Sequence, residues 1–222
     1  MPRQARAAIL FDFDGVLAET MPDHFRAWTL ALKDFGVNLT AENYYPFEGL
    51  AMDKLASKYC LENHIPAGES KKIIEKKEKY YLANYQFRLY PGASELIEEL
   101  YGKKIPIAIV TTGLKVRLLK STPLNFLNKF STIVTGDDVN RGKPFPDPYL
   151  KAAHDLSANI ADCVVVENSP MGVESAKSAG AYCIGILSTL DAEHLVGADQ
   201  VVSSFSELKN IKVIQEILAQ SQ

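Results

Sequence analysis

Short, continuous apolar runs that alternate with helical patterns are the feature that most constrains the fold of this chain. Uninterrupted apolar residues, rather than every second one, are typical of strands buried on both faces of a parallel sheet. The predicted strands are residues 7–13, 105–110, 132–134, 163–166, 181–187 and 200–202, and the last of these is a possible edge strand.

Helical patterns separate these runs from residue 90 onward. They cover residues 92–100, 149–156, 171–179 and 206–218. This alternation predicts an α/β fold with a doubly wound, Rossmann-like parallel sheet, whose ligand site lies at the carboxyl ends of the strands.

Local signals mark some helix ends. Asp147 before Pro148 and Ser169 before Pro170 each predict an N-cap followed by a proline at the first helical position, and Gly180 predicts a helix end.

The segment between the first two strands breaks this alternation. Its patterns at 23–35, 52–62 and 69–87 are helical, and none predicts a strand between them. We therefore predict a catalytic core of residues 1–17 and 90–222, with a helical domain of residues 18–89 inserted after the first strand.

Charge and composition exclude several classes of protein. The 222 residues carry a formal net charge of −3, which gives no basic surface for nucleic acid or an anionic membrane. No apolar stretch is long enough to span a bilayer. Cys60, Cys163 and Cys183 lack metal-ligand spacing, which fits a reducing compartment. We expect a cytoplasmic protein with no nucleic-acid or membrane partner.

Asp12 and Asp14 lie two residues apart at the end of the first predicted strand, so their carboxylates share a face. Two such charges repel unless a cation or a shared proton compensates them, and Mg²⁺ is the natural oxygen-seeking cation. The alternative to a metal or catalytic site is that Asp14-Gly15 forms only a turn and that Asp12 is a solvated strand end.

Further polar residues directly follow the second predicted strand, and another lies in a later loop. Thr111, Thr112 and Gly113 offer a hydroxyl and backbone N–H groups to a phosphate, although a threonine at this position is more often a helix N-cap. Lys143 lies in a proline-rich loop at 141–148, and the stiff backbone there weighs a phosphate or carboxylate partner evenly against a solvent-exposed lysine.

Glu167 and Asn168 follow the 163–166 strand. A carboxylate there is either charged surface or a metal ligand in the crevice of the sheet, and an amide oxygen stands beside it. The joint occurrence of polar groups at several strand ends is far more specific than any one of them.

The four motifs are the Asp12–Asp14 pair, Thr111 to Gly113, Lys143 and the Glu167–Asn168 pair. In this order they resemble those of the haloacid dehalogenase superfamily of aspartate-nucleophile phosphohydrolases. The inserted segment resembles the small α-helical cap of that superfamily. More narrowly, residues 23–28, 142–144 and 166–172 are similar to the β-phosphoglucomutase-like subfamily, which also contains sugar-phosphate phosphatases.

The resemblance implies a role for each motif. Asp12 would attack phosphorus and form an aspartyl-phosphate, while Asp14 would protonate the leaving oxygen and then deprotonate water. Thr111 and Lys143 would bind the transferring phosphoryl group. Thr112 and Gly113 would contact the substrate.

The metal ligands follow from the same resemblance. Mg²⁺ would be held by Asp12, the backbone carbonyl of Asp14, and Glu167 or Asn168.

His24, in the inserted segment, either faces this site or is a partly buried helix histidine. One cap lysine, Lys76 or Lys77, is a further candidate that the predicted site leaves out.

Two departures from the family bear on function. Asn168 stands where family members commonly carry a second acid, so one negative charge near the metal is missing. Met52 stands where the mutases carry a phosphate-gripping arginine, which favours hydrolysis over mutase chemistry.

We therefore predict a Mg²⁺-dependent phosphatase, monomeric or weakly dimeric, acting on a small phosphorylated metabolite, with a sugar phosphate favoured. The alternatives are a β-phosphoglucomutase-like mutase and a catalytically impaired phosphometabolite-binding protein.

Overall fold

Six parallel strands in the order β3-β2-β1-β4-β5-β6 form the centre of the structure, a computed structural model that describes residues 8–219. All six predicted strands are present, and Ala7 lies outside the described residues. The strands are β1 (Ala8–Phe11), β2 (Ile107–Val110), β3 (Thr132–Val134), β4 (Cys163–Glu167), β5 (Tyr182–Ile186) and β6 (Gln200–Val202).

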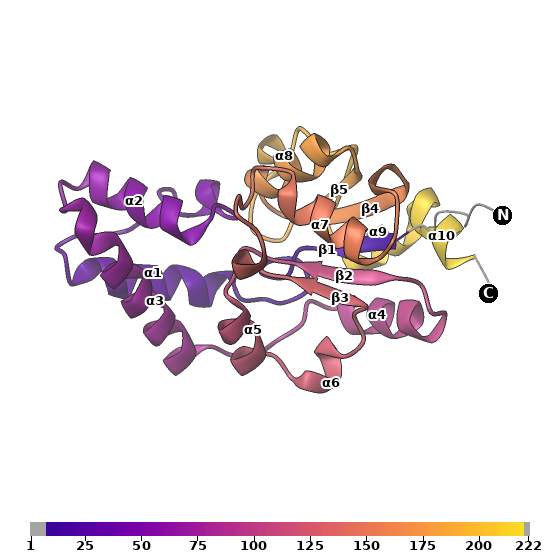
Figure 1. Cartoon of the computed structure of the whole chain (residues 1–222), viewed down its shortest axis with the longest axis horizontal. Helices are drawn as coiled ribbons and strands as arrows, with labels where there is room; N and C mark the ends of the chain where they lie inside the picture. Colours follow the sequence, from indigo (N-terminus) through magenta and orange to yellow (C-terminus); the bar gives the residue numbers. More distant parts are fainter. Residues whose placement is uncertain (1–7, 220–222) are drawn as a thin grey trace.

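Helices cover both faces of this sheet, as predicted for a doubly wound fold (Figure 1). In β1, Ile9 and Phe11 pack into one apolar cluster, while Ala8 and Leu10 pack into the other. The first face carries α4 (Ala93–Gly102), α5 (Lys115–Ser121), α6 (Leu124–Leu127), α9 (Phe205–Asn210) and α10 (Lys212–Leu218). The second face carries α7 (Asp147–Asp155) and α8 (Pro170–Ala179).

The structure corrects two local predictions. Residues 206–218 form two helices, because Ile211 is extended between α9 and α10 and packs against the apolar core. Asp147 is the first residue of α7 and Pro146 is the N-cap; the Asp147 carboxylate accepts hydrogen bonds of 3.0 Å from Arg141 and does not cap the helix.

The other two predicted helix ends are confirmed. The Ser169 hydroxyl caps α8 by accepting the Gly172 N–H at 3.1 Å. Gly180 ends α8 with a left-handed φ of 90°, which favours glycine.

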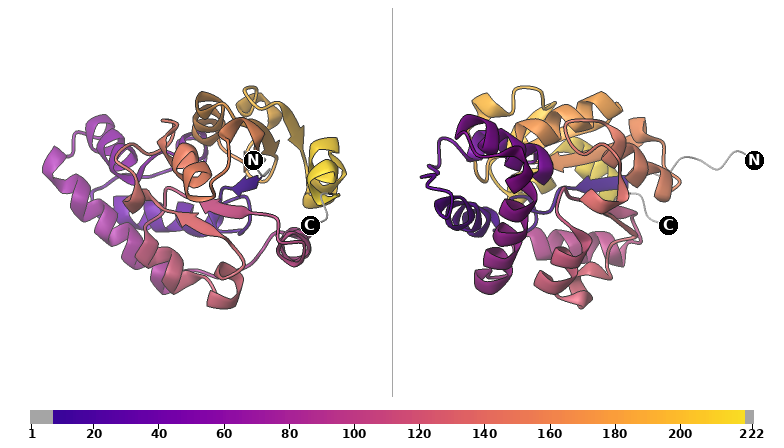
Figure 2. Two further views of the ribbon diagram at one scale, coloured as in Figure 1. Left: turned by 45° about the vertical axis from the view of Figure 1, so that its right-hand side comes forward. Right: turned by 60° about the vertical axis from the view of Figure 1, so that its left-hand side comes forward.

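The inserted segment forms a separate group of helices, which we call the helical unit. It consists of α1 (Met21–Lys33), η1 (Tyr45–Phe47), α2 (Met52–Glu62), η2 (Ala67–Glu69) and α3 (Ser70–Asn84). These helices pack around an apolar cluster of their own that includes Trp28, Tyr59 and Ile73. Figure 1 and the left view of Figure 2 show the unit on the side of the sheet away from α10.

Two segments connect the helical unit to the sheet, and they lie side by side. The Tyr90 N–H donates to the Leu17 carbonyl at 3.0 Å, and the Glu19 N–H donates to the Arg88 carbonyl at 2.9 Å. None of the helices in the described part of the chain combines the length and apolarity needed to cross a membrane.

The strand order also determines where a ligand can enter. After β1 the chain passes through the helical unit to α4 on the first face, whereas after neighbouring β4 it passes to α8 on the second face. Connections that leave adjacent strands in opposite directions open a crevice at their carboxyl ends. The residues that follow β1, β2 and β4 line this crevice.

Candidate active site

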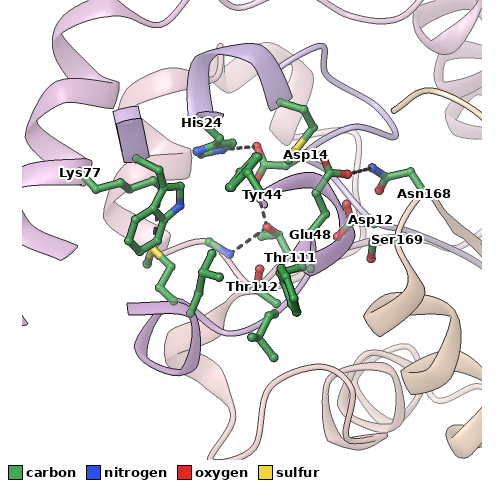
Figure 3. A pocket seen from close by; sticks show the side chains of 18 of the residues that line it. Asp12, Asp14, His24, Tyr44, Glu48, Lys77, Thr111, Thr112, Asn168 and Ser169 are labelled. Atoms are coloured by element: carbon green, nitrogen blue, oxygen red, sulfur yellow. Dashed lines mark hydrogen bonds and ion pairs between the residues drawn. The ribbon is translucent and has the colours of Figure 1, made fainter. Parts of the chain in front are cut away.

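A cavity of about 60 Å³ lies between the carboxyl ends of the strands and the helical unit. The core contributes residues that directly follow strands, among them Asp12, Thr111 and Asn168. The helical unit contributes Glu48 and Lys77 (Figure 3). The structure therefore brings residues from both parts of the chain to one site.

Lys143 is not among the residues that line this cavity; it is 1% exposed and contacts Asp12, which does line it. Its Nζ donates to Asp12 Oδ1 at 2.5 Å, to Glu167 Oε1 at 2.6 Å and to the Val110 carbonyl at 3.0 Å. Burial raises the pKa of Asp12 to about 8, against the lowering effect of Lys143. One ammonium thus faces two buried carboxyl groups, which excludes the alternative of a solvent-exposed lysine.

Glu167 is fully buried, and hydrogen bonds occupy both of its carboxylate oxygens. Oε1 accepts from Lys143 at 2.6 Å and from the Tyr149 hydroxyl at 2.7 Å. Oε2 accepts from the backbone N–H groups of Asn168 and Ser169 and from the Ser169 hydroxyl. In this arrangement Glu167 orients Lys143 and the loop after β4, so the alternative of a charged surface residue is wrong.

Asp14 is held mainly by Arg117. The guanidinium donates to its two carboxylate oxygens at 2.7 and 3.2 Å, and the Thr20 hydroxyl adds a bond of 2.7 Å. Burial alone would raise the pKa of Asp14, but Arg117 and His24 hold it well below its usual value. The arrangement favours ionised Asp14, the form that accepts a proton.

His24 contacts the site from α1. Its Nε2 lies 3.1 Å from Asp14 Oδ1 (Figure 3), and its ring stacks on Tyr81 with centroids 4.2 Å apart. Burial lowers the pKa of His24 to about 4, which favours the neutral ring at pH 7. The predicted proximity of His24 to the candidate nucleophile loop is therefore present in the structure.

Of the two candidate lysines, Lys77 rather than Lys76 lines the cavity. Lys77 is 2% exposed and donates to Glu78 at 2.7 Å, whereas Lys76 pairs with Asp34 at the surface. Burial lowers the pKa of Lys77 to about 8, even though Glu78 raises it. The helical unit thus presents one buried amine to a ligand.

Thr111, Thr112 and Gly113 all line the cavity after β2. The Thr111 hydroxyl accepts the Gly113 N–H at 3.0 Å and lies 3.4 Å from Asp14 Oδ2. The next helix, α5, begins at Lys115 without a side-chain cap, so Thr111 is not a helix N-cap.

Sequence reasoning missed Arg117, which is 2% exposed on α5. The sequence feature that could have indicated a buried Arg117 is Gly113, four residues earlier. A Cβ atom at Gly113 would lie 1.7 Å from a guanidinium nitrogen, so the absence of a side chain there makes room for the arginine.

Sequence reasoning also missed Glu48, which precedes the stretch in which Met52 stands. Glu48 is 3% exposed, and its Oε2 accepts from Asn168 Nδ2 at 3.1 Å and from the Thr189 hydroxyl at 2.7 Å. No feature of the sequence predicted that this residue reaches the core.

The polar groups at this site fit Mg²⁺ by charge and donor type. Within residues 8–219 there is no ready group of three or more His, Cys, Asp or Glu ligands. Yet Asp12 and Glu48 are buried acids, and burial raises the pKa of each to about 8. The Oε1 atom of Glu48 is buried without a hydrogen-bond partner among the described residues. An oxygen-binding cation would satisfy such a site.

Comparisons with known proteins show what this chain is similar to. Residues 9–186 match the family model described as haloacid dehalogenase-like hydrolase. A phosphorylated carbohydrates phosphatase of Thermotoga maritima is 31% identical, over 95% of this chain and 99% of that protein. The beta-phosphoglucomutase of Bacillus subtilis is 26% identical, over 90% of this chain and 91% of that protein.

A solved structure extends the comparison to three dimensions. CbbY from Rhodobacter sphaeroides in complex with phosphate matches with a TM-score of 0.79 at 29% identity, covering 92% of this chain and 96% of that one. The similarity therefore includes both the sheet and the helical unit.

Proposed function

Because this chain belongs to the haloacid dehalogenase-like hydrolase family, we propose that it is a Mg²⁺-dependent phosphatase of a small phosphorylated metabolite, with a sugar phosphate favoured. The observation that carries the proposal is the contact of 2.5 Å between Lys143 and Asp12, at the edge of the sheet where Thr111 follows the neighbouring strand. This arrangement offers a nucleophile and a fixed cation to one phosphoryl group.

Asp12 acts as the nucleophile. One of its carboxylate oxygens bonds to phosphorus while the bond to the leaving oxygen breaks, which gives an aspartyl-phosphate. Water then attacks phosphorus, the bond to Asp12 breaks, and inorganic phosphate leaves with Asp12 regenerated. Lys143 and Thr111 hold the phosphoryl oxygens during both steps.

Asp14 moves the protons. Asp14 must be protonated, against its lowered pKa, to give a proton to the leaving oxygen in the first step; as the carboxylate it then takes one from water in the second. Arg117 and His24 orient the carboxylate, and by favouring its ionised form they assist the second step most directly.

The metal would be held by Asp12, the backbone carbonyl of Asp14, and Glu167 or Asn168. When bound, Mg²⁺ supplies positive charge that offsets the phosphoryl group and orients it for attack. The occupied oxygens of Glu167 favour Asn168 for the last position.

The helical unit, residues 18–89, acts as a cap over the core of residues 1–17 and 90–222. The cavity beneath it is small, at about 60 Å³. A second hollow of about 320 Å³ shares Met52, Thr111 and Thr112 with that cavity and is also lined by Ile74 and Leu114. This hollow supports a substrate with a small organic part, and larger substrates would require the cap to open.

The mutase and the impaired binding protein remain the alternatives. A mutase needs a second phosphate site, and Met52 stands where the related mutases carry an arginine. Lys77 lines the cavity, and its Nζ lies 3.9 Å from the Met52 sulfur. A cytoplasmic location and a monomer or weak dimer remain part of the proposal.

Phosphate release from sugar phosphates and p-nitrophenyl phosphate, with Mg²⁺ and with EDTA, tests the proposed function. Native protein and the control Asp191→Asn, an exposed residue, should release phosphate only with Mg²⁺. Asp12→Asn should abolish release and keep the fold. Substantial turnover by Asp12→Asn would remove Asp12 from the role of nucleophile, and interconversion of glucose phosphates without release would identify a mutase.

A further inference from the structure

Glu48 links the helical unit to the core at the edge of the proposed metal site. It follows η1 directly and is 3% exposed (Figure 3). The next residue, Gly49, has a left-handed φ of 79°, and a Cβ there would lie 2.4 Å from the Ser169 hydroxyl. This close approach of backbone to the α8 N-terminus fixes the position from which Glu48 reaches the core.

One carboxylate oxygen of Glu48 is well satisfied. Oε2 accepts from Asn168 Nδ2 at 3.1 Å and from the Thr189 hydroxyl at 2.7 Å, and these donors lie in the loops after β4 and β5. Glu48 thereby joins the helical unit to two core loops.

The other oxygen has no such partner. Oε1 is buried, and no described residue donates a hydrogen bond to it. A buried carboxylate oxygen without a partner is costly. The ionisable groups around it include Asp12, Asp14 and Glu167, all acids, which cannot satisfy it when ionised. The Lys143 ammonium is already shared by Asp12 and Glu167.

We propose that Glu48 Oε1 is a ligand of the Mg²⁺ ion bound at Asp12, so that the helical unit supplies the carboxylate that the core lacks at Asn168. The inference rests on the proposed function, because it concerns the metal of the same site. Asn168 occupies that core position, and its side-chain amide donates a hydrogen bond to the Glu48 carboxylate. The negative charge near the metal is therefore moved from the core to the cap.

This relocation has a consequence that a ligand at residue 168 would not have. Mg²⁺ contacts both parts of the chain only when the helical unit is closed, so it binds the closed form more tightly than the open form. A ligand with such a preference shifts the population toward closure. Metal binding and cap closure are thus coupled through one side chain.

Isothermal titration with Mg²⁺ alone tests the ligand. Glu48→Gln should weaken Mg²⁺ binding by about tenfold or more, which is the scale of losing a group that supports a metal site. Glu42→Gln, an exposed acid of the same unit, should bind as the native protein does. The double variant Glu48→Gln/Asn168→Asp restores an acid to the core and should return the affinity to within about threefold of native.

Amide hydrogen exchange of residues 48–52 tests the coupling. Mg²⁺ should protect these amides in the native protein and in Glu42→Gln. It should protect them much less in Glu48→Gln and in the double variant, whose metal site then lies wholly on the core. Restored affinity without restored protection would separate the ligand role from a general effect of charge.

Native Mg²⁺ affinity and native protection in Glu48→Gln would overturn the inference. That result would leave the proposed function standing if phosphate release still required Mg²⁺ and Asp12. Conversely, failure of the native protein to release phosphate would refute the proposed function, while the titration with Mg²⁺ would still test Glu48.

Discussion

Replacing Arg117 with methionine should lower the free energy of unfolding by about 3 kcal/mol, because it leaves the Asp14 carboxylate buried without its main cation. Arg117 is 2% exposed and donates to both carboxylate oxygens of Asp14, at 2.7 and 3.2 Å. Methionine keeps an unbranched side chain beside the Tyr81 ring, so the change removes charge more than packing.

The magnitude follows from the contacts that remain. Removing one partner of a buried ion pair typically costs about 3–5 kcal/mol. Asp14 keeps the Thr20 hydroxyl at 2.7 Å and His24 at 3.1 Å, and Glu78 keeps Lys77 at 2.7 Å. These residual partners place the expected loss near the lower end of that range.

Urea unfolding in EDTA measures the loss. Fluorescence of Trp28, the single tryptophan, follows the helical unit, and circular dichroism follows the whole chain, so coincident transitions justify a two-state analysis. A double-mutant cycle with Asp14→Asn should give a coupling energy of about 2 kcal/mol or more. The control is Arg26→Met, whose side chain is 59% exposed and lies 3.7 Å from Asp23.

The control should cost no more than about 1 kcal/mol, because the Arg26 side chain is exposed and Asp23 keeps its hydrogen bond from the Gln86 N–H. If Arg117→Met cost as little as Arg26→Met, or if the cycle showed no coupling to Asp14, the account of the Arg117–Asp14 pair would be refuted.

The cost of Arg117→Met should also depend on pH. In the native protein the pKa of Asp14 is held below its unfolded value of about 3.9, so the stability from this group is fully present above that pH and is lost as pH falls through the folded pKa. In the variant, burial raises the pKa of Asp14, and protonation then relieves the unpaired charge. The difference in unfolding free energy between the two proteins should therefore be smaller at pH 5 than at pH 7.

Three further predictions concern the same site. Gly113→Ala should displace Arg117 and cost about 2–4 kcal/mol in urea unfolding, whereas Gly102→Ala, whose Cβ has open space in α4, should change stability by less than about 1 kcal/mol. Ser169→Ala should cost about 1–2 kcal/mol, because it removes the cap on the Gly172 N–H; an unchanged unfolding midpoint would contradict this. Mg²⁺ at about 100 times its dissociation constant should stabilise the native protein by about 2.7 kcal/mol, measured as a rise in thermal midpoint that EDTA reverses.

The core of the site was predictable because its residues directly follow strands. Apolar runs locate β1, β2 and β4, and parallel strands bring their carboxyl ends to one edge of the sheet. Asp12, Thr111 and Glu167 therefore converge from local sequence signals alone. The roles of these residues remain predictions, whereas the sheet that positions them is confirmed.

Arg117 and Glu48 were not predictable in the same way. Each is a charged residue outside the strand ends, and each becomes part of the site only through packing between the helical unit and the core. Helix phase and the tilt of one unit on the other decide which side chains face inward, and neither is encoded in a local pattern. The separation of α9 from α10 at Ile211 has the same origin, since core packing rather than helix propensity ends α9.

These two residues also indicate how closure and chemistry are connected. Arg117 belongs to the core but lies within 3.9 Å of Glu78 and 3.2 Å of His24 on the helical unit. Glu48 belongs to the helical unit but bonds to Asn168 and Thr189 on the core. Polar contacts across the closing interface are thus the same contacts that orient Asp14 and surround the proposed metal. Opening the cap would break both sets at once, so we expect substitutions at this interface to change kcat and KM together rather than KM alone.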